Sequence, residues 1–301
     1  MTTGQTMAPG EWATAADAYR EDGVTILRNV IDPDAIRAIR DDLAGVVEEA
    51  CGTKMERSLS GEPFAKRTTE VLWEAVCREP KTRNLLYTYA QRVPTLYSLA
   101  NAAALRQLAR SVSMSKPSVR EAKVQIFLPW EKLFFQDCHQ DINSLDSVNS
   151  VTFWIPLHPL TEKTAVRYWV GSHREGPVRH EEIVDEAEAI YLERVPKSLQ
   201  DKYPNVRTAV ASEGDVIAIN RLVFHQSPDF EDQFYARWSV VVRYDDIAGQ
   251  GLFSGTTKFA DLAPNSVDKM KERLEHIRAF LAQKPRIDWR EKLLRARRAT
   301  T

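Results

Sequence analysis

A histidine and an aspartate stand two positions apart in this chain, at His139 and Asp141. A second histidine, His225, follows a Gly-Asp turn and an apolar run. In an extended segment residues i and i+2 point to one face, so His139 and Asp141 can bind the same ion. Two neutral imidazoles and one carboxylate are the ligands of non-haem Fe(II) oxygenases, which keep open positions for a co-substrate and oxygen. A His-x-Asp pair also arises by chance, so the alternative for His139 is an ordinary surface or core histidine.

The segment 234–244 (FYARWSVVVRY) carries a second, independent signal. Strand alternation gives it one mixed face, with Arg237, Tyr235, Ser239, Val241 and Arg243, and one apolar face, with Phe234, Ala236, Trp238, Val240 and Val242. We expect the apolar face to pack under helices and Arg237 to enter a barrel interior. A buried guanidinium requires an anion, and its fork fits a carboxylate. The expected anion is the distal carboxylate of 2-oxoglutarate, and the alternative is a salt bridge to a core Asp or Glu.

Short β-type runs would position these residues. They recur between 119 and 250, and Gly, Pro and Asp clusters separate several of them, at 122–128, 151–157, 166–170, 208–211, 215–219 and 234–244. Evenly spaced short strands without alternating helices indicate a sandwich or barrel rather than a βαβ fold. The predicted fold class is therefore α+β, with a β core inside helices.

Helical patterns flank this β region on both sides. Before it the sequence predicts helices over 11–19, 32–51, 69–78 and 81–111, the last broken near Pro94, with a strand at 24–27 and a polar loop over 53–68. After it the chain is again helical from Asn265. We expect one domain over 1–301, made of a mainly helical part (1–118), a β core (119–250) and a helical extension (251–301).

Several motifs in the same order resemble the phytanoyl-CoA dioxygenase-like family. They are His139-Gln140-Asp141, the strand 150–157, Gly171-Ser172-His173, Gly214-Asp215, His225-x-Ser227 and Arg237-Trp238-Ser239. The resemblance covers about residues 15–250. It implies a double-stranded β-helix (jelly-roll, cupin-like) core, with His139, Asp141 and His225 as the iron ligands and Arg237 as the 2-oxoglutarate anchor. It further implies co-substrate contacts from Ser227 and Gln125, and a pocket wall from Trp154 or Thr152.

The resemblance implies a dioxygenase that uses Fe(II), 2-oxoglutarate and O2. We expect hydroxylation of a small-molecule metabolite, such as a biosynthetic or natural-product intermediate, with release of succinate and CO2. Asp141 stands where halogenating relatives carry a small residue, so oxygenation is favoured over halogenation. Two other classes remain open, a cupin-type isomerase without redox chemistry and a non-catalytic jelly-roll binding protein.

Composition excludes several classes of partner. The 301 residues contain 41 Lys+Arg and 42 Asp+Glu, so no basic excess points to nucleic acid. No apolar stretch approaches the roughly 20 residues that span a bilayer. Three scattered cysteines fit a reducing compartment, and we expect a cytoplasmic protein.

The remaining candidates have structural explanations. His180 precedes two glutamates in a charged stretch, so we expect a solvated face, whereas His173 is either structural or on the substrate side. Cys138 is expected to be a packing residue. The basic tail after Arg286 is expected to be solvated. The apolar stripe before it can dock on the core or on a second copy of the chain, which leaves a homodimer open. The loop 53–68 and the segment 142–148 are expected to shape the choice of substrate.

Overall fold

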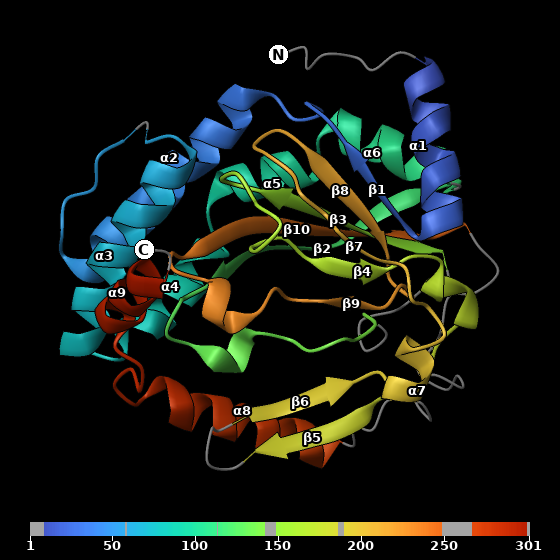
Figure 1. The fold of residues 1–301 in the computed structure, drawn as a ribbon. Helices are drawn as coiled ribbons and strands as arrows, with labels where there is room; N and C mark the ends of the chain where they lie inside the picture. The colour runs from blue at the N-terminus through green and yellow to red at the C-terminus, as the bar shows by residue number, and fades with distance from the viewer. Residues whose placement is uncertain are drawn as a thin grey trace.

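The computed structural model describes residues 9–57, 59–112, 114–141, 149–185, 190–248 and 267–299. Its centre is an antiparallel five-stranded sheet in the order β1-β8-β3-β10-β2 (Figure 1). The bounds are β1 Val24–Leu27, β2 Pro117–Phe127, β3 Ser150–Pro156, β8 Val216–Asn220 and β10 Arg237–Asp246. A second sheet has the order β7-β4-β9, with β7 Val206–Thr208, β4 Arg167–Trp169 and β9 His225–Gln226. Strands β5 (Glu181–Asp185) and β6 (Ile190–Arg194) form a separate antiparallel pair.

Helices surround the five-stranded sheet, as Figure 1 shows, while β5, β6 and α8 lie below it in that view. The N-terminal helices are α1 Pro9–Asp22, α2 Pro33–Cys51, α3 Gly61–Arg78, α4 Thr82–Ala90, α5 Pro94–Ala100 and α6 Ala103–Ser111. Short helix α7 spans Lys197–Gln200, and the chain ends with α8 Val267–Leu281 and α9 Trp289–Ala299. Antiparallel sheets flanked by helices confirm the predicted α+β class. Among the described residues, no helix is long and apolar enough to cross a membrane.

Strand β10 has one face toward the main core and the other toward the inner side of the sheet. Ala236, Trp238, Val240 and Val242 belong to the large apolar cluster that the sheet forms with α1 to α6, which confirms the predicted apolar face from Ala236 onward. Before the strand begins the alternation fails, because Tyr235 packs against this cluster and Phe234 is not part of it. The opposite face of β10 starts with Arg237. The register pairs Ser239 with Gln125 on β2, and Arg243 with Thr152 on β3. Inward residues of three neighbouring strands therefore meet on one side of the sheet.

Some predicted boundaries are wrong, and each error has a physical cause. The loop predicted over 53–68 ends early, because α3 begins at Gly61 and buries Phe64 and Ala65 in the core. The helical run 81–111 is three helices, since a second break at 101–102 accompanies the expected one near Pro94. The strand predicted from residue 208 is β7 and ends there, and the one predicted from residue 234 begins at Arg237.

The sequence predicted a solvated C-terminal tail, and this prediction is wrong for one face of α9. Trp289 is buried, and its ring lies 6.3 Å from that of Trp73 and 6.4 Å from that of Trp130. Lys292 is also buried and donates to the backbone carbonyl of Phe230. Burial lowers the pKa of Lys292 to about 8. Helix α9 is thus anchored on the main core by one face.

Candidate active site

The candidate metal ligands come together where two extended segments meet. His139 and His225 form an antiparallel bridge, with N–H···O distances of 2.9 and 3.0 Å between their backbones. One ligand atom from each of His139, Asp141 and His225 lies within 4.8 Å of the others. Gln140 points the other way and is buried, and its amide bonds to the backbones of Gly176, Leu222 and Val178. The i, i+2 geometry expected of this segment is therefore present.

Backbone carbonyls fix both imidazoles in one tautomer. Nδ1 of His139 lies 2.8 Å from the carbonyl oxygen of Asp137, and Nδ1 of His225 lies 3.0 Å from that of Val223. A carbonyl only accepts, so each Nδ1 donates, and in the neutral ring each Nε2 then keeps its lone pair for a metal. Burial and the neighbouring His225 lower the pKa of His139 to about 3, so this imidazole is neutral at physiological pH. These donors fit a divalent transition metal.

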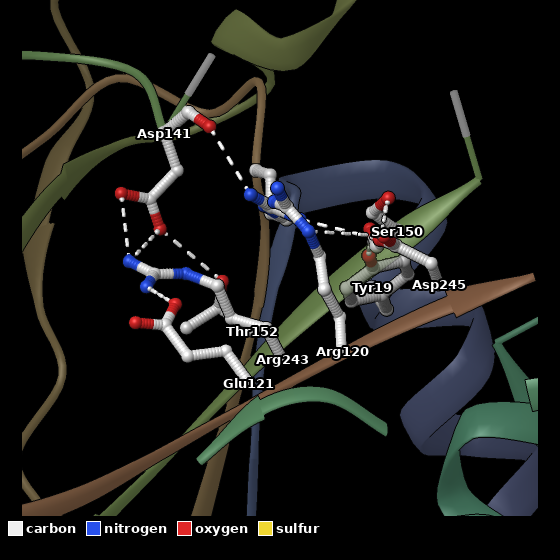
Figure 2. Close-up of polar contacts among 9 residues, drawn as sticks. Tyr19, Arg120, Glu121, Asp141, Ser150, Thr152, Arg243 and Asp245 are labelled. Atoms are coloured by element: carbon white, nitrogen blue, oxygen red, sulfur yellow. Dashed lines mark hydrogen bonds and ion pairs between the residues drawn. The ribbon is translucent and has the colours of Figure 1, made fainter. Parts of the chain in front are cut away.

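The carboxylate of Asp141 is held by donors on β3 and β10. Figure 2 shows Thr152 and Arg243 converging on it: the Thr152 hydroxyl donates to Oδ2 over 3.2 Å, and Arg243 Nη2 lies 3.3 and 3.2 Å from the two oxygens. Although burial acts in the opposite direction, the positive charge of Arg243 holds the pKa of Asp141 well below its usual range. Arg243 also pairs with Glu121. Asp141 is therefore an ionised, oriented ligand.

A second layer of charges supports this arrangement. Arg221 pairs with Asp245 over 3.2 Å and also donates to the backbone carbonyl of Asp141 over 3.4 Å. Asp245 in turn accepts from the Ser150 hydroxyl, and Figure 2 shows Arg120 and Tyr19 beside this pair. Buried ion pairs of this kind hold their members in defined geometry. Both the side chain and the backbone of Asp141 are thus held.

Arg237 is buried without an acidic partner in the part of the chain that the structure describes. It is 1 % exposed, and its guanidinium lies 4.3 Å from the ring centroid of Phe127 and 5.3 Å from that of Trp154. Nη1 donates to the carbonyl of Thr164 over 3.0 Å, while Nε has no hydrogen-bond partner. Burial lowers its pKa to about 9. Among the described residues Arg237 forms no core salt bridge, which was the alternative. A bound carboxylate would satisfy its guanidinium.

One cavity contains all the residues predicted for the site. Its wall includes the metal triad, Arg237, and the four other predicted contacts, Gln125, Thr152, Trp154 and Ser227. Trp154 is fixed by a 2.7 Å hydrogen bond from Nε1 to the Ser239 hydroxyl. Lys123, Phe127 and Gln136 line the same cavity but were not among the residues predicted for the site. Alternation from Gln125 along β2 would have found the first two.

The other candidates from the sequence, His180, His173 and Cys138, have structural roles. His180 is buried rather than solvated, because its Nε2 accepts from the backbone N–H of Gln140 over 3.3 Å, and the solvated-face prediction is wrong. His173 Nε2 lies 3.1 Å from the carbonyl of Arg20, a structural contact. Cys138 is fully buried among apolar residues, as predicted. The segment 142–148 lies outside the described residues.

This fold and cavity define a class of protein, the Fe(II)/2-oxoglutarate-dependent oxygenases. Residues 19–231 match the family described as phytanoyl-CoA dioxygenase (PhyH), so the chain belongs to that family. Its double-stranded β-helix core agrees with the predicted fold. No curated protein matches the chain.

Solved structures share the fold at low sequence identity. The epimerase SnoN from nogalamycin biosynthesis, in complex with Fe3+, alpha ketoglutarate and nogalamycin RO, is 16% identical with a TM-score of 0.53. That match covers 86% of this chain and 93% of SnoN. The apo form of EctD from S. alaskensis is 13% identical with a TM-score of 0.51, over 83% of this chain and 81% of EctD. At these identities the likeness extends to the fold alone.

Proposed function

We propose that this protein is a dioxygenase that hydroxylates a small-molecule metabolite, with His139, Asp141 and His225 as iron ligands and Arg237 as the anchor of 2-oxoglutarate. The observation that carries the proposal is the convergence, in one cavity, of three metal-ligand atoms and a buried arginine with no acidic partner among the described residues. Hydroxylation is the proposed outcome because the family is described as a dioxygenase. Epimerisation, the activity named for SnoN, is the competing outcome.

When bound, Fe(II) and 2-oxoglutarate together supply oxygen activation, with succinate and CO2 as the products. The protein contributes geometry. His139 and His225 present Nε2 lone pairs, and Asp141 presents a carboxylate whose Oδ2 is already hydrogen-bonded to Thr152. Arg237 would bind the far carboxylate of the co-substrate, with Ser227 and Gln125 as further polar contacts. The aromatic wall around Arg237 excludes water and strengthens that ion pair.

The test is an anaerobic titration with Fe(II) and then 2-oxoglutarate, followed by O2 and a metabolite panel scored by succinate release. Asp141→Ala and His225→Ala should lose metal binding and turnover. His276→Ala, on the exposed side of α8, should change neither. Normal iron content and activity in either ligand variant would contradict the assignment. Metal-dependent product formation without succinate would indicate an isomerase, and a wild-type protein that binds no iron would indicate a binding protein.

The setting of the reaction is part of the same proposal. Cys51, Cys77 and Cys138 are free thiols, which supports the predicted cytoplasmic location. The proposed partner is a small molecule that enters the cavity. A second copy of the chain stays a prediction, and size-exclusion chromatography with light scattering tests it.

A further inference from the structure

Lys123 is a cavity-lining cation to which the proposed function assigns no role. It lies on β2 in the inward row that continues through Gln125 and Phe127, and all three residues line the cavity of the metal triad. Its side chain is 33% exposed, so it is not sealed in the core. The ion pair described for it is a contact of 3.7 Å between Nζ and Oε1 of Glu121.

The negative charge beside Lys123 is already engaged. Glu121 pairs with Arg243, and Arg243 also contacts both oxygens of Asp141. Burial and the neighbouring Arg243 lower the pKa of Lys123, which means that both disfavour its charged form. A divalent ion bound by two neutral imidazoles and the single carboxylate of Asp141 would add further positive charge. With a metal bound, this end of the cavity would carry an excess of positive charge, which favours an anion.

Lys123 and Arg237 lie toward opposite ends of this inward row, because Arg237 is paired in register with Phe127. The Arg237 guanidinium lies against the ring of Phe127, whereas Lys123 pairs with Glu121 at the other end of the inward row. Lys123 and Phe127 are four residues apart on β2, which separates their Cα atoms by about 13 Å at roughly 3.3 Å per residue. The proposed 2-oxoglutarate would occupy the Arg237 end of the row. The Lys123 end of the cavity is then left for a different ligand.

We infer that Lys123 binds an anionic group of the substrate, a carboxylate or a phosphate, on the side of the metal triad away from Arg237. The inference rests on the proposed function, since it takes the co-substrate to occupy the Arg237 end. It places the substrate among anionic metabolites rather than neutral ones. It also makes Lys123 a specificity-determining residue, because its charge would orient the remainder of the substrate toward the metal.

The experiment uses the full-length protein loaded anaerobically with Fe(II) and 2-oxoglutarate. Absorbance of the iron–2-oxoglutarate chelate first confirms loading. Fluorine NMR then follows trifluoroacetate as the carboxylate probe, monofluorophosphate as the phosphate probe and trifluoroethanol as the neutral probe. Relaxation by Fe(II) reports whether a bound probe lies near the metal. We expect saturable relaxation of at least one anionic probe and none of trifluoroethanol, and the preferred anion identifies the source of the charge.

Variants separate the possible outcomes. Lys123→Gln should weaken probe binding about tenfold or more and leave 2-oxoglutarate affinity unchanged. Lys123→Arg should retain binding. The control is Lys163→Gln, because Lys163 has a similar 3.7 Å ion pair with Asp232 but an exposed side chain. Equal probe binding by Lys123→Gln and wild type, or loss of 2-oxoglutarate affinity in Lys123→Gln, would overturn the inference. A wild-type protein that forms no chelate would instead refute the proposed function.

Discussion

Replacing Arg237 by methionine should abolish tight co-substrate binding without destabilising the protein. Burial lowers the pKa of Arg237 from its ordinary value to about 9, which corresponds to about 5 kcal/mol of cost for the buried charge. Contacts with the rings of Phe127 and Trp154 offset about 2 kcal/mol. The hydrogen bond to Thr164 offsets about 2 kcal/mol more. A net penalty of about 1 kcal/mol remains, which Arg237→Met removes while keeping most of the stem.

Binding should change in the opposite direction. Truncating one partner of a buried, hydrogen-bonded charge pair costs about 2–5 kcal/mol, so Arg237→Met should weaken 2-oxoglutarate about 30-fold to several-thousand-fold. Arg237→Lys should be intermediate, because it keeps the charge and loses the fork. The assay is thermal unfolding with and without 2-oxoglutarate, beside an anaerobic titration. Wild type should gain about 2.7 kcal/mol at a hundredfold excess over Kd, and the variant should gain little.

Two results would refute this reasoning. Unchanged affinity in Arg237→Met would show that the co-substrate is anchored elsewhere. A loss of more than about 2 kcal/mol of stability would show that Arg237 has a structural anion partner. Arg167→Met is the control for generic loss of an arginine, because Arg167 is partly exposed and pairs with Asp229. It should leave affinity unchanged.

Three further predictions concern the supports of the site and the fold. Thr152→Val removes the hydrogen bond to Asp141 Oδ2 and should weaken Co(II) binding about 10-fold or more, and an unchanged titration would contradict that role. Below pH 8 Lys292 is charged in both the folded and the unfolded protein. As the pH rises further, Lys292 loses its proton in the folded protein first. Stability should therefore rise by about 1 kcal/mol from pH 7 to 9 in urea unfolding, a rise that should be absent in Lys292→Met. His180→Leu deprives the Gln140 N–H of its acceptor and should cost about 1–3 kcal/mol, against no change for His276→Leu.

The residues that the sequence selected for the site lie together in one cavity, whereas their surroundings were less predictable. His139, Asp141 and His225 could be selected because ligand type and period-two spacing are local properties. The inward direction of Arg237 followed from alternation in its own strand. In contrast, the partners of Arg243 are Glu121 and Asp141, which lie far from it in the chain, and no local pattern shows that pairing.

The burial of His180 was missed for a similar reason. Its neighbours Glu181 and Glu182 give the segment a charged, surface-like composition, yet the pairing of β5 with β6 begins there. The start of α3 was missed because its first turn includes Gly61 and Pro63, which resemble loop residues. Its helical state depends on Phe64, which packs on Trp238 with ring centroids 5.4 Å apart. Such long-range packing overrides local propensity.

Strand β10 has a consequence for how this protein can change over evolution. Its even-numbered residues from Trp238 to Val242 belong to the main core, while Arg237, Val241 and Arg243 face the cavity. Substitutions along this one segment should therefore alternate in effect, with loss of folded protein at one position and altered ligand preference at the next. New substrate specificity can arise at alternate positions while the core stays intact. A slip of one residue in pairing would exchange the two sets, so folding and ligand recognition depend on the same register.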